Sequence, residues 1–297
     1  MFEEVKRMYY SGNIIIRLIF INVAVFLLIN IIGLFSFLFT GAGAESLGLI
    51  DWLAVPADLG KLLYRPWTLI TYAFLHYDFL HILFNMLWLY WFGKIFLEFL
   101  SSKQLLNVYL LGGISGAALY ILAYNVFPAF SQSVPYSYAL GASAAVYAVV
   151  IAIAAFVPDY SIILMFIGRV QIKYIAIFVV VLDLLSISGG NAGGHIAHLG
   201  GALFGFLFAT QIKSGSDITA WFGKFTNDIA SWFKAKPKMR VTENKFKNKP
   251  ASDIEYNQQK AVNQEVIDKI LEKISKSGYN SLTKKEKEIL FKMSNKK

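Results

Sequence analysis

Long apolar segments, separated by short polar ones, fill the first two thirds of this 297-residue chain. A helix needs about 20 apolar residues to cross the hydrocarbon of a bilayer. The pattern predicts six spans, at residues 14–39, 79–99, 104–125, 139–158, 174–188 and 194–212. The apolar piece 162–167 is too short to cross, so we expect it at the membrane interface. The expected fold class is an all-α, polytopic membrane protein.

The first apolar segment has a competing interpretation as a secretory signal, because Ala42, Gly43 and Ala44 are typical of a cleavage site. Its apolar run exceeds the usual ~7–15 residues of a signal, which favours an uncleaved span. Composition agrees with a membrane protein, since 56% of the residues are hydrophobic and only 16% are charged. Soluble domains carry about 25% charged residues. The absence of cysteine excludes disulfides and thiolate metal sites.

Positive charge predicts the orientation of these spans. Of 28 lysines and arginines, nine precede residue 200 and 19 lie beyond Gln211. If the N-terminus faces inward, the outer segments hold only Lys61 and Arg65. Positive residues favour the cytoplasmic side, so we expect a cell-membrane protein with both termini in the cytoplasm. The net charge of +9 resides mostly in the tail, where it suits contact with anionic lipid; we do not expect nucleic-acid binding.

The polar end of the chain is expected to form separate regions. We divide the chain into a cytoplasmic N-terminus (1–13), a six-span domain (14–212), a basic linker (213–260) and a small helical appendage (261–297). Ser281 to Glu286 has the pattern of a helix start. The appendage is too small to bury much core of its own.

Three polar groups lie at a similar shallow depth, because the second, fourth and sixth spans all enter from the outer face. The second opens with His76, His81 and Asn85, the fourth with Ser143, and the sixth with His195 and His198. All four histidines of the chain belong to this set. Ionisable groups inside a membrane are costly and usually mark function.

Ser143 and His198 are the candidate nucleophile and base. Ser143 is expected about one turn into its helix, where unpaired backbone N–H groups can stabilise an oxyanion. Taken alone, Ser143 fits a small packing residue better than a nucleophile. Gly201 and Gly205 follow His198 on one face, so a close-packed fourth span would bring the imidazole beside the serine. A serine needs such a base.

Supporting roles follow for residues near this pair. Tyr147, one turn below Ser143, is placed to hold the imidazole. His81 and Asn85, four apart on one face, can donate hydrogen bonds to an oxyanion, or can join helices with no catalytic part. We expect no carboxylate in a third role, hence a dyad, and interpret Asp183 as an ordinary polar residue near a helix end.

Metal binding is the rival chemistry for the histidines. The pairs His195/His198 and His76/His81 could supply ligands, but the His-Glu-x-x-His motif of membrane zinc proteases is absent. No glutamate lies within either group. We therefore expect neither a metal nor a cofactor.

Three motifs in this order resemble those of the rhomboid family of intramembrane serine proteases: His81-x-x-x-Asn85, Gly141-Ala-Ser143-Ala144 and Ala197-His198-x-x-Gly201-x-x-x-Gly205. The resemblance covers roughly residues 60–212. It implies a six-helix bundle whose water-filled cavity opens outward. It also implies Ser143 as nucleophile, His198 as base, His81 and Asn85 at the oxyanion, and Tyr147 packed on the base.

Two departures from the family pattern stand out. Ala144 replaces the usual glycine after the serine, and its methyl is expected where substrate must approach. Thr68 follows Trp67, where relatives often carry arginine. Neither removes a catalytic group.

The leading hypothesis is an intramembrane serine endopeptidase that cleaves single-span or multi-span membrane proteins near the outer membrane boundary. The alternative is a catalytically silent relative that binds transmembrane segments without cutting them. A transporter or channel ranks far behind, because paired broken helices and a charge relay are lacking.

Overall fold

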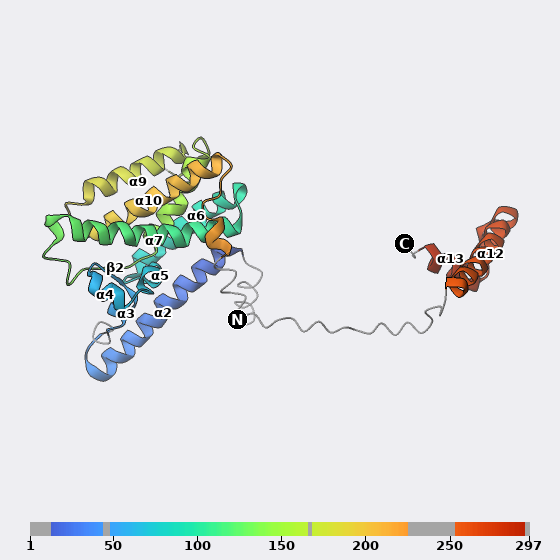
Figure 1. The fold of residues 1–297 in the computed structure, drawn as a ribbon, viewed down its shortest axis with the longest axis horizontal. Coiled ribbons are helices and arrows are strands. Elements are labelled where there is room, and N and C mark those ends of the chain that lie inside the picture. Colours follow the sequence, from blue (N-terminus) through green and yellow to red (C-terminus); the bar gives the residue numbers. More distant parts are fainter. Residues whose placement is uncertain (1–12, 44–47, 166–167, 225–252, 295–297) are drawn as a thin grey trace. The chain divides into compact units, whose positions relative to one another are not determined.

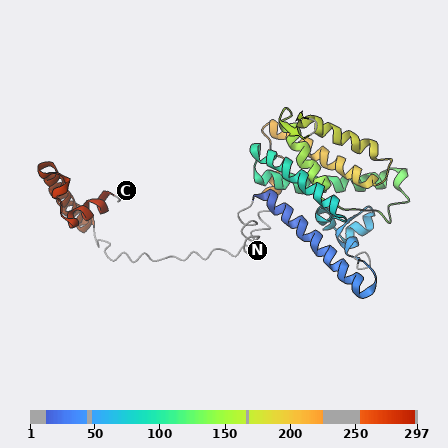
Figure 2. The ribbon, with the colours of Figure 1, turned by 180° about the vertical axis from the view of Figure 1, so that it is seen from behind.

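A computed structural model describes residues 13–43, 48–165, 168–224 and 253–294. The chain divides into two compact units, Met1–Ala235 and Lys236–Lys297, which are considered separately. The longer helices described in the first unit, called the membrane unit below, can be followed in Figures 1 and 2. These helices are α2 (Ile14–Thr40), α6 (Phe79–Phe99), α7 (Ser102–Val126), α8 (Ser143–Phe156), α9 (Ile172–Ser186) and α10 (Ala192–Lys213).

Within the described residues, four helices are long and apolar enough to cross a membrane, namely α2, α6, α7 and α10. Their positions agree with four of the six predicted spans. Helix α8 is apolar but has only 14 residues, and α9 has 15. The predicted fourth span therefore contains a shorter helix than the apolar pattern suggested.

Short elements connect these helices, and some of them are strands. They are α3 (Leu49–Leu53), β1 (Val55–Pro56), α4 (Leu59–Tyr64), α5 (Thr68–Thr71), η2 (Tyr72–Phe74), η3 (Pro128–Phe130), β2 (Tyr138–Ala139), β3 (Ser161–Leu164) and β4 (Gly168–Gln171). Strands β1 and β2 pair antiparallel, with Val55 opposite Ala139. Strands β3 and β4 form a second antiparallel pair, so residues 162–164 of the short apolar piece belong to a strand. The all-α prediction is wrong in this detail.

Helix α8 forms the centre of the membrane unit. Its residues are mostly alanine, valine and isoleucine, and ten of them are buried. Small residues on the neighbouring helices let backbones approach α8 closely. A side chain at Gly201 or Gly205 of α10 would collide with the carbonyl of Ala144 or Ala148. The glycine spacing in α10 thus produces the close helix contact that it predicts.

Helix α2 packs much less tightly. Near its start, Ile15 and Leu18 are buried in the core, and Ile15 contacts α6 at Gly93. Asn22 is also buried and donates a hydrogen bond to the Tyr109 hydroxyl of α7 at 3.1 Å. Most later side chains of α2 are exposed, and both ribbon views show this helix diverging from the bundle.

The C-terminal unit contains α12 (Asp253–Ser277), η4 (Tyr279–Ser281) and α13 (Lys284–Ser294). Helix α12 begins inside the stretch predicted as linker. Among the residues described here, Ile270 of α12 and Leu282 of the connection are the buried apolar side chains. The predicted helix start near residue 281 is present, because α13 begins directly after Thr283.

Candidate active site

Ser143 is the first residue of α8, and the prediction that it lies one turn into a helix is wrong. The preceding residues cannot be helical, because Tyr138 and Ala139 pair with β1. Gly141 then adopts φ +126°, a conformation that other residues rarely adopt, and donates its N–H to the Tyr72 carbonyl at 2.9 Å. The first backbone N–H groups of a helix have no partner within it. The backbone N–H groups of Ser143 and the residues directly after it are therefore not used by hydrogen bonds within α8.

His81 lies directly against this turn. A Cβ atom on Gly141 would come within 2.7 Å of His81 Cε1 and 3.6 Å of Ser143 Oγ. The imidazole and the serine hydroxyl therefore face the same space. The backbone N–H of His81 donates to Asp78, which caps the start of α6, at 2.8 Å. This cap fixes the turn of helix that carries the imidazole.

Asn85 follows one turn later and is buried. Its Nδ2 donates to the His81 carbonyl at 2.9 Å, which occupies one of its two amide hydrogens. His81 and Asn85 line a cavity of about 360 Å³ together with residues of α8 and α9, among them Tyr147 and Val179. The two predicted oxyanion residues and Tyr147 therefore border one cavity.

His76 supports the turn from the other side, a role that sequence reasoning missed. The Ala142 N–H donates to His76 Nε2 at 3.4 Å, and the ring contacts His81 edge-on at 5.1 Å. Burial, reinforced by the nearby His81, lowers the pKa of His76 to about 4, so that the ring is neutral and can accept at pH 7. The contact joins residues 66 positions apart, and no local spacing signals it.

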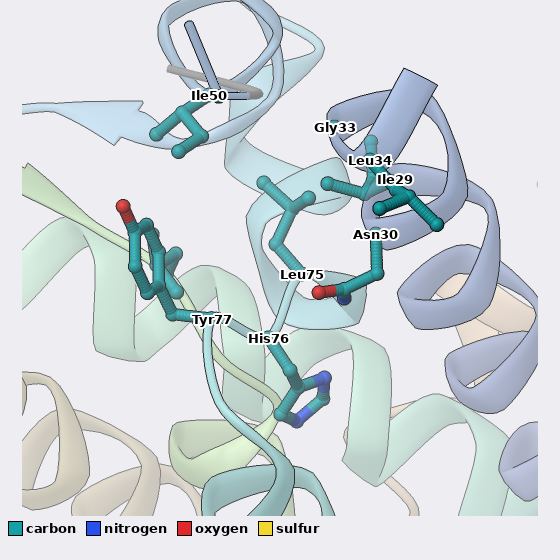
Figure 3. Close-up of a pocket in the computed structure, with 10 residues that line it drawn as sticks. Ile29, Asn30, Gly33, Leu34, Ile50, Leu75, His76 and Tyr77 are labelled. Carbon is teal, nitrogen blue, oxygen red and sulfur yellow. The ribbon is translucent and has the colours of Figure 1, made fainter. Parts of the chain in front are cut away.

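A second cavity, of about 390 Å³, lies between α2 and the loop before α6. His76 and Asn30 are among the residues that line it (Figure 3). The buried Nδ1 of His76 has no hydrogen-bond partner among the described residues. The rest of the lining is mainly apolar, including Leu75 and Ile50.

His198 is held by aromatic stacking. Its ring lies 4.4 Å from that of Tyr147, with an interplanar angle of 17°. The close contact of Gly201 with Ala144 brings this turn of α10 beside the start of α8. In the described part of the chain Ser143 and His198 share no hydrogen bond. The ring nitrogen Nδ1 of His198 bonds elsewhere.

That partner is Asp183, which corrects two predictions. Asp183 is only 4% exposed, and its Oδ1 accepts hydrogen bonds from Nδ1 of His195 at 2.7 Å and of His198 at 3.0 Å. It is therefore not an ordinary helix-end residue, and a carboxylate does lie beside the candidate base. The sequence contained a signal for this contact. Asp183 lies near the end of α9 and His195 lies near the start of α10, at about the same distance from the connection between the two helices. A short connection makes such helices antiparallel neighbours.

The same three side chains form a group that could hold a metal ion, with donor atoms within 4.8 Å of one another. Ligand atoms bound about 2.0 Å from a tetrahedral zinc ion lie roughly 3.3 Å apart. The 2.7 and 3.0 Å separations here are shorter and suit hydrogen bonds.

Ala144 does not lie in the path of a substrate, so that expectation is also wrong. The residue is 1% exposed. Its methyl points toward α7, where a Cβ on Gly116 would come within 2.5 Å of it. The glycine in α7 thus leaves room for the alanine methyl after Ser143.

Two family models match different parts of the chain. A family model described as "Rhomboid domain" matches residues 64–214, and one for a family of unknown function, DUF6576, matches residues 252–296. The chain is 32% identical over 160 residues to "RHOMBOID-like protein 12, mitochondrial" of Arabidopsis thaliana, covering 51% of this chain and 48% of the relative. It is 30% identical over 104 residues to "Rhomboid protease GlpG" of Pectobacterium atrosepticum, covering 35% and 33%. The matched segments thus span about half or less of these relatives.

Proposed function

The chain belongs to the rhomboid family and is a multi-pass membrane protein, and on this premise we propose that it is an intramembrane serine endopeptidase. One observation carries the proposal. Ser143 begins α8 among backbone N–H groups that are not bonded within the helix, with the His81 imidazole on one side and the helix turn that carries His198 on the other. These are the parts that acyl transfer needs: a nucleophile, a base and oxyanion donors.

In the proposed reaction His198 transfers protons, while His81 and Asn85 stabilise the oxyanion. The Ser143 hydroxyl attacks the scissile carbonyl while His198 accepts its proton. The oxyanion that forms is stabilised by the backbone N–H of Ser143 and by His81 and Asn85. The protonated His198 then gives its proton to the leaving amine, and the acyl-enzyme remains. Water, deprotonated by His198, attacks the ester; as the ester bond breaks, His198 returns the proton to Ser143 Oγ and the carboxylic product leaves.

The length of α8 supports a site below the membrane surface. Fourteen residues of helix extend about 21 Å, less than the roughly 30 Å of hydrocarbon. In our proposal all six helices cross, both termini are cytoplasmic, and Ser143 opens to the outer side. Irregular backbone at membrane depth is tolerated where it is buried, and the turn at Gly141 is buried against His81. Water reaching that cavity would supply the hydrolysis step.

Membrane proteins are the proposed substrates. The cavity of about 360 Å³ beside His81, Asn85 and Tyr147 has room for a short stretch of extended chain. Its remaining lining is largely apolar, with Trp88 and Val179 among the residues. Such a lining suits a segment that unwinds from a transmembrane helix near the membrane boundary.

The second candidate is a rhomboid-like protein that binds transmembrane segments without cleavage. One observation favours it, namely that His198 bonds to Asp183 and not to Ser143. Catalytic hydrogen bonds are often long before substrate binds, so this observation weighs little against the intact nucleophile and base.

Cleavage in detergent tests the proposal. Wild type, Ser143→Ala and His198→Ala are purified alike and incubated with a panel of single-span test substrates. We expect cleavage by the wild type and none by either variant, with unchanged melting temperatures for the serine variant. Cleavage retained by Ser143→Ala would contradict the assigned nucleophile, and cleavage retained by His198→Ala the assigned base.

A further inference from the structure

We propose that Asp183 is a positioning residue, which fixes the ring of His198 so that Nε2 remains the basic nitrogen available to Ser143. The inference rests on the proposed protease function and extends it from a pair of residues to a cluster. His195 is the fourth member, as a second donor to the same carboxylate oxygen.

Hydrogen-bond chemistry determines the tautomers. An ionised carboxylate can only accept, so each imidazole that bonds to Asp183 must carry its proton on Nδ1. The Nε2 atom of a neutral His198 is then unprotonated, as a general base requires. Stacking on Tyr147 fixes the ring plane, while the bond to Asp183 fixes its rotation within that plane.

Burying the Asp183 carboxylate lowers the stability of the fold, which suggests that the residue is kept for a function. Asp183 is 4% exposed, and no lysine or arginine among the described residues pairs with it. Its Oδ2 is buried without a hydrogen-bond partner in the described chain. Buried carboxylates are usually paired, and ionisable groups inside a membrane usually mark function. A negative charge here would stabilise the imidazolium that forms when His198 takes the serine proton.

The titratable groups that face this carboxylate come from two neighbouring helices. His195 and His198 extend from α10, and the Tyr147 hydroxyl interacts with Asp183 from α8. His81 of α6 interacts electrostatically with His198. A substitution of Asp183 therefore alters the surroundings of His198 directly. A substitution of His195 alters the same cluster but leaves the bond between Asp183 and His198, so it is the comparison variant.

Kinetics over a range of pH tests the positioning role. We expect Asp183→Asn to lower kcat by a factor on the order of 10²–10⁴, with little change in KM. The acidic limb of its pH–rate profile moves to lower pH, because the imidazolium loses its negative neighbour. His195→Asn keeps the profile of the wild type and loses activity only several-fold. Asn22→Leu, which removes a buried polar group of α2 whose hydrogen bonds go to Leu18 and Tyr109, controls for general destabilisation.

A second measurement does not depend on activity. With only four histidines in the chain, ¹⁵N-histidine NMR of the full protein in detergent can be assigned from single His→Gln variants. We expect neutral His195 and His198 to carry Nδ1–H in the wild type, although imidazole in water prefers Nε2–H. Asp183→Asn removes this preference from His198.

Two outcomes would overturn the inference: Nε2–H tautomers for both rings, or an Asp183→Asn enzyme with the kcat and pH profile of the wild type. If Asp183→Asn lowers the melting temperature but leaves kcat and the pH profile unchanged, Asp183 has only a structural role, and the inference is overturned. Failure of the protease proposal looks different. In that case the wild type cleaves no more than Ser143→Ala, while the tautomers still report whether Asp183 holds the two rings.

Discussion

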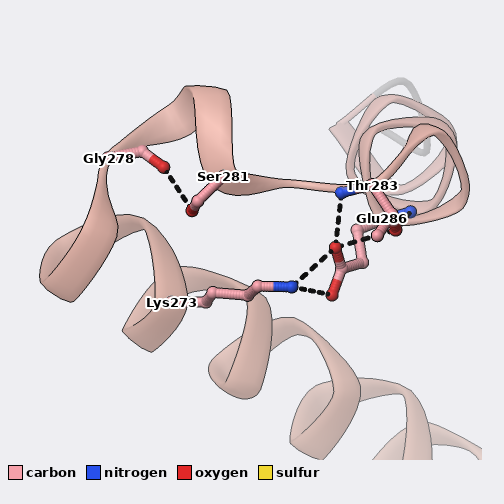
Figure 4. Close-up of polar contacts among 5 residues, drawn as sticks. All are labelled: Lys273, Gly278, Ser281, Thr283 and Glu286. Carbon is pink, nitrogen blue, oxygen red and sulfur yellow. Dashed lines mark hydrogen bonds and ion pairs between the residues drawn. The ribbon is translucent and has the colours of Figure 1, made fainter.

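Two carboxylates in this chain use their negative charge in opposite ways. Asp183 of the membrane unit is buried and accepts hydrogen bonds from two imidazoles. Glu286 of the C-terminal unit accepts from the N–H and hydroxyl of Thr283 and forms an ion pair with Lys273 at 2.9 Å (Figure 4). Glu286 stabilises the local start of a helix in contact with water. Asp183 has no such local task, which is why its burial points to function.

The two units also differ in how their helices meet. In the membrane unit, glycines of α10 bring it against the backbone of α8 at Ala144 and Ala148. In the C-terminal unit, described on its own, the buried contacts come from side chains such as Ile270 and Leu282. Backbone contacts leave no room for added atoms, whereas side-chain contacts can rearrange. Substitutions should therefore cost more in the first unit.

The largest effect is expected for Gly201→Leu. The new side chain would collide with the Ala144 carbonyl and push α10 away from α8, carrying His198 with it. We expect a lower melting temperature and complete loss of cleavage. Gly190→Ala is the matched control, because a Cβ at that position meets nothing within 4 Å. Equal stability of the two variants would contradict the close packing.

Gly141→Ala should affect chemistry more than folding. A Cβ here would approach His81 Cε1 to 2.7 Å at a φ of +126°. The displaced imidazole no longer faces the oxyanion, so we expect cleavage to fall by a factor on the order of 10²–10³. Gly168 also has a positive φ, of +89°, but a Cβ there meets nothing within 4 Å. Gly168→Ala therefore introduces backbone strain without a collision and is the control. The account fails here if both variants lose activity equally.

His76→Gln is expected to change the pH dependence of stability. Burial lowers the pKa of His76 to about 4 from the ordinary histidine value of 6.5, so the folded state binds its proton less readily than the unfolded state. The stabilisation is complete above pH 6.5 and is lost as the pH falls toward 4. Melting temperatures measured between pH 7 and 4 should therefore decline less steeply for the variant. Parallel curves would count against a buried, neutral His76.

Glu286→Gln should have the smallest effect and leave cleavage unchanged. Hydrogen bonds from Thr283, followed by Lys273, lower the pKa of Glu286 to about 2 from 4.5. The folded state therefore prefers the ionised form, and its contribution is present above pH 4.5 and lost as the pH falls toward 2. Hydrogen exchange of residues 253–294 in the full protein should be faster in the variant at pH 7. The difference should vanish near pH 2, and a constant difference would contradict the ionised cap.

The length of the apolar segments predicted the long helices well, because a membrane requires each span to be apolar over its own length. It misjudged the start of α8, since Tyr138 and Ala139 are equally apolar but pair with a strand more than 80 positions earlier. The candidate serine of α8 and the candidate base of α10, with the glycines that follow it, could be selected from the sequence spacing within each helix. The contacts of Asp183, His76 and Ala144 could not, because each depends on which helices become neighbours.

Labelling of Ser143 by a fluorophosphonate tests the central claim most directly, because it requires an activated serine and no known substrate. The wild type, Ser143→Ala and His198→Ala are treated in detergent, and the adduct is mapped by mass spectrometry. We predict a single adduct on Ser143 in the wild type and loss of that adduct in both variants. An unlabelled Ser143 in the folded wild type would contradict the protease and favour a protein that only binds transmembrane segments.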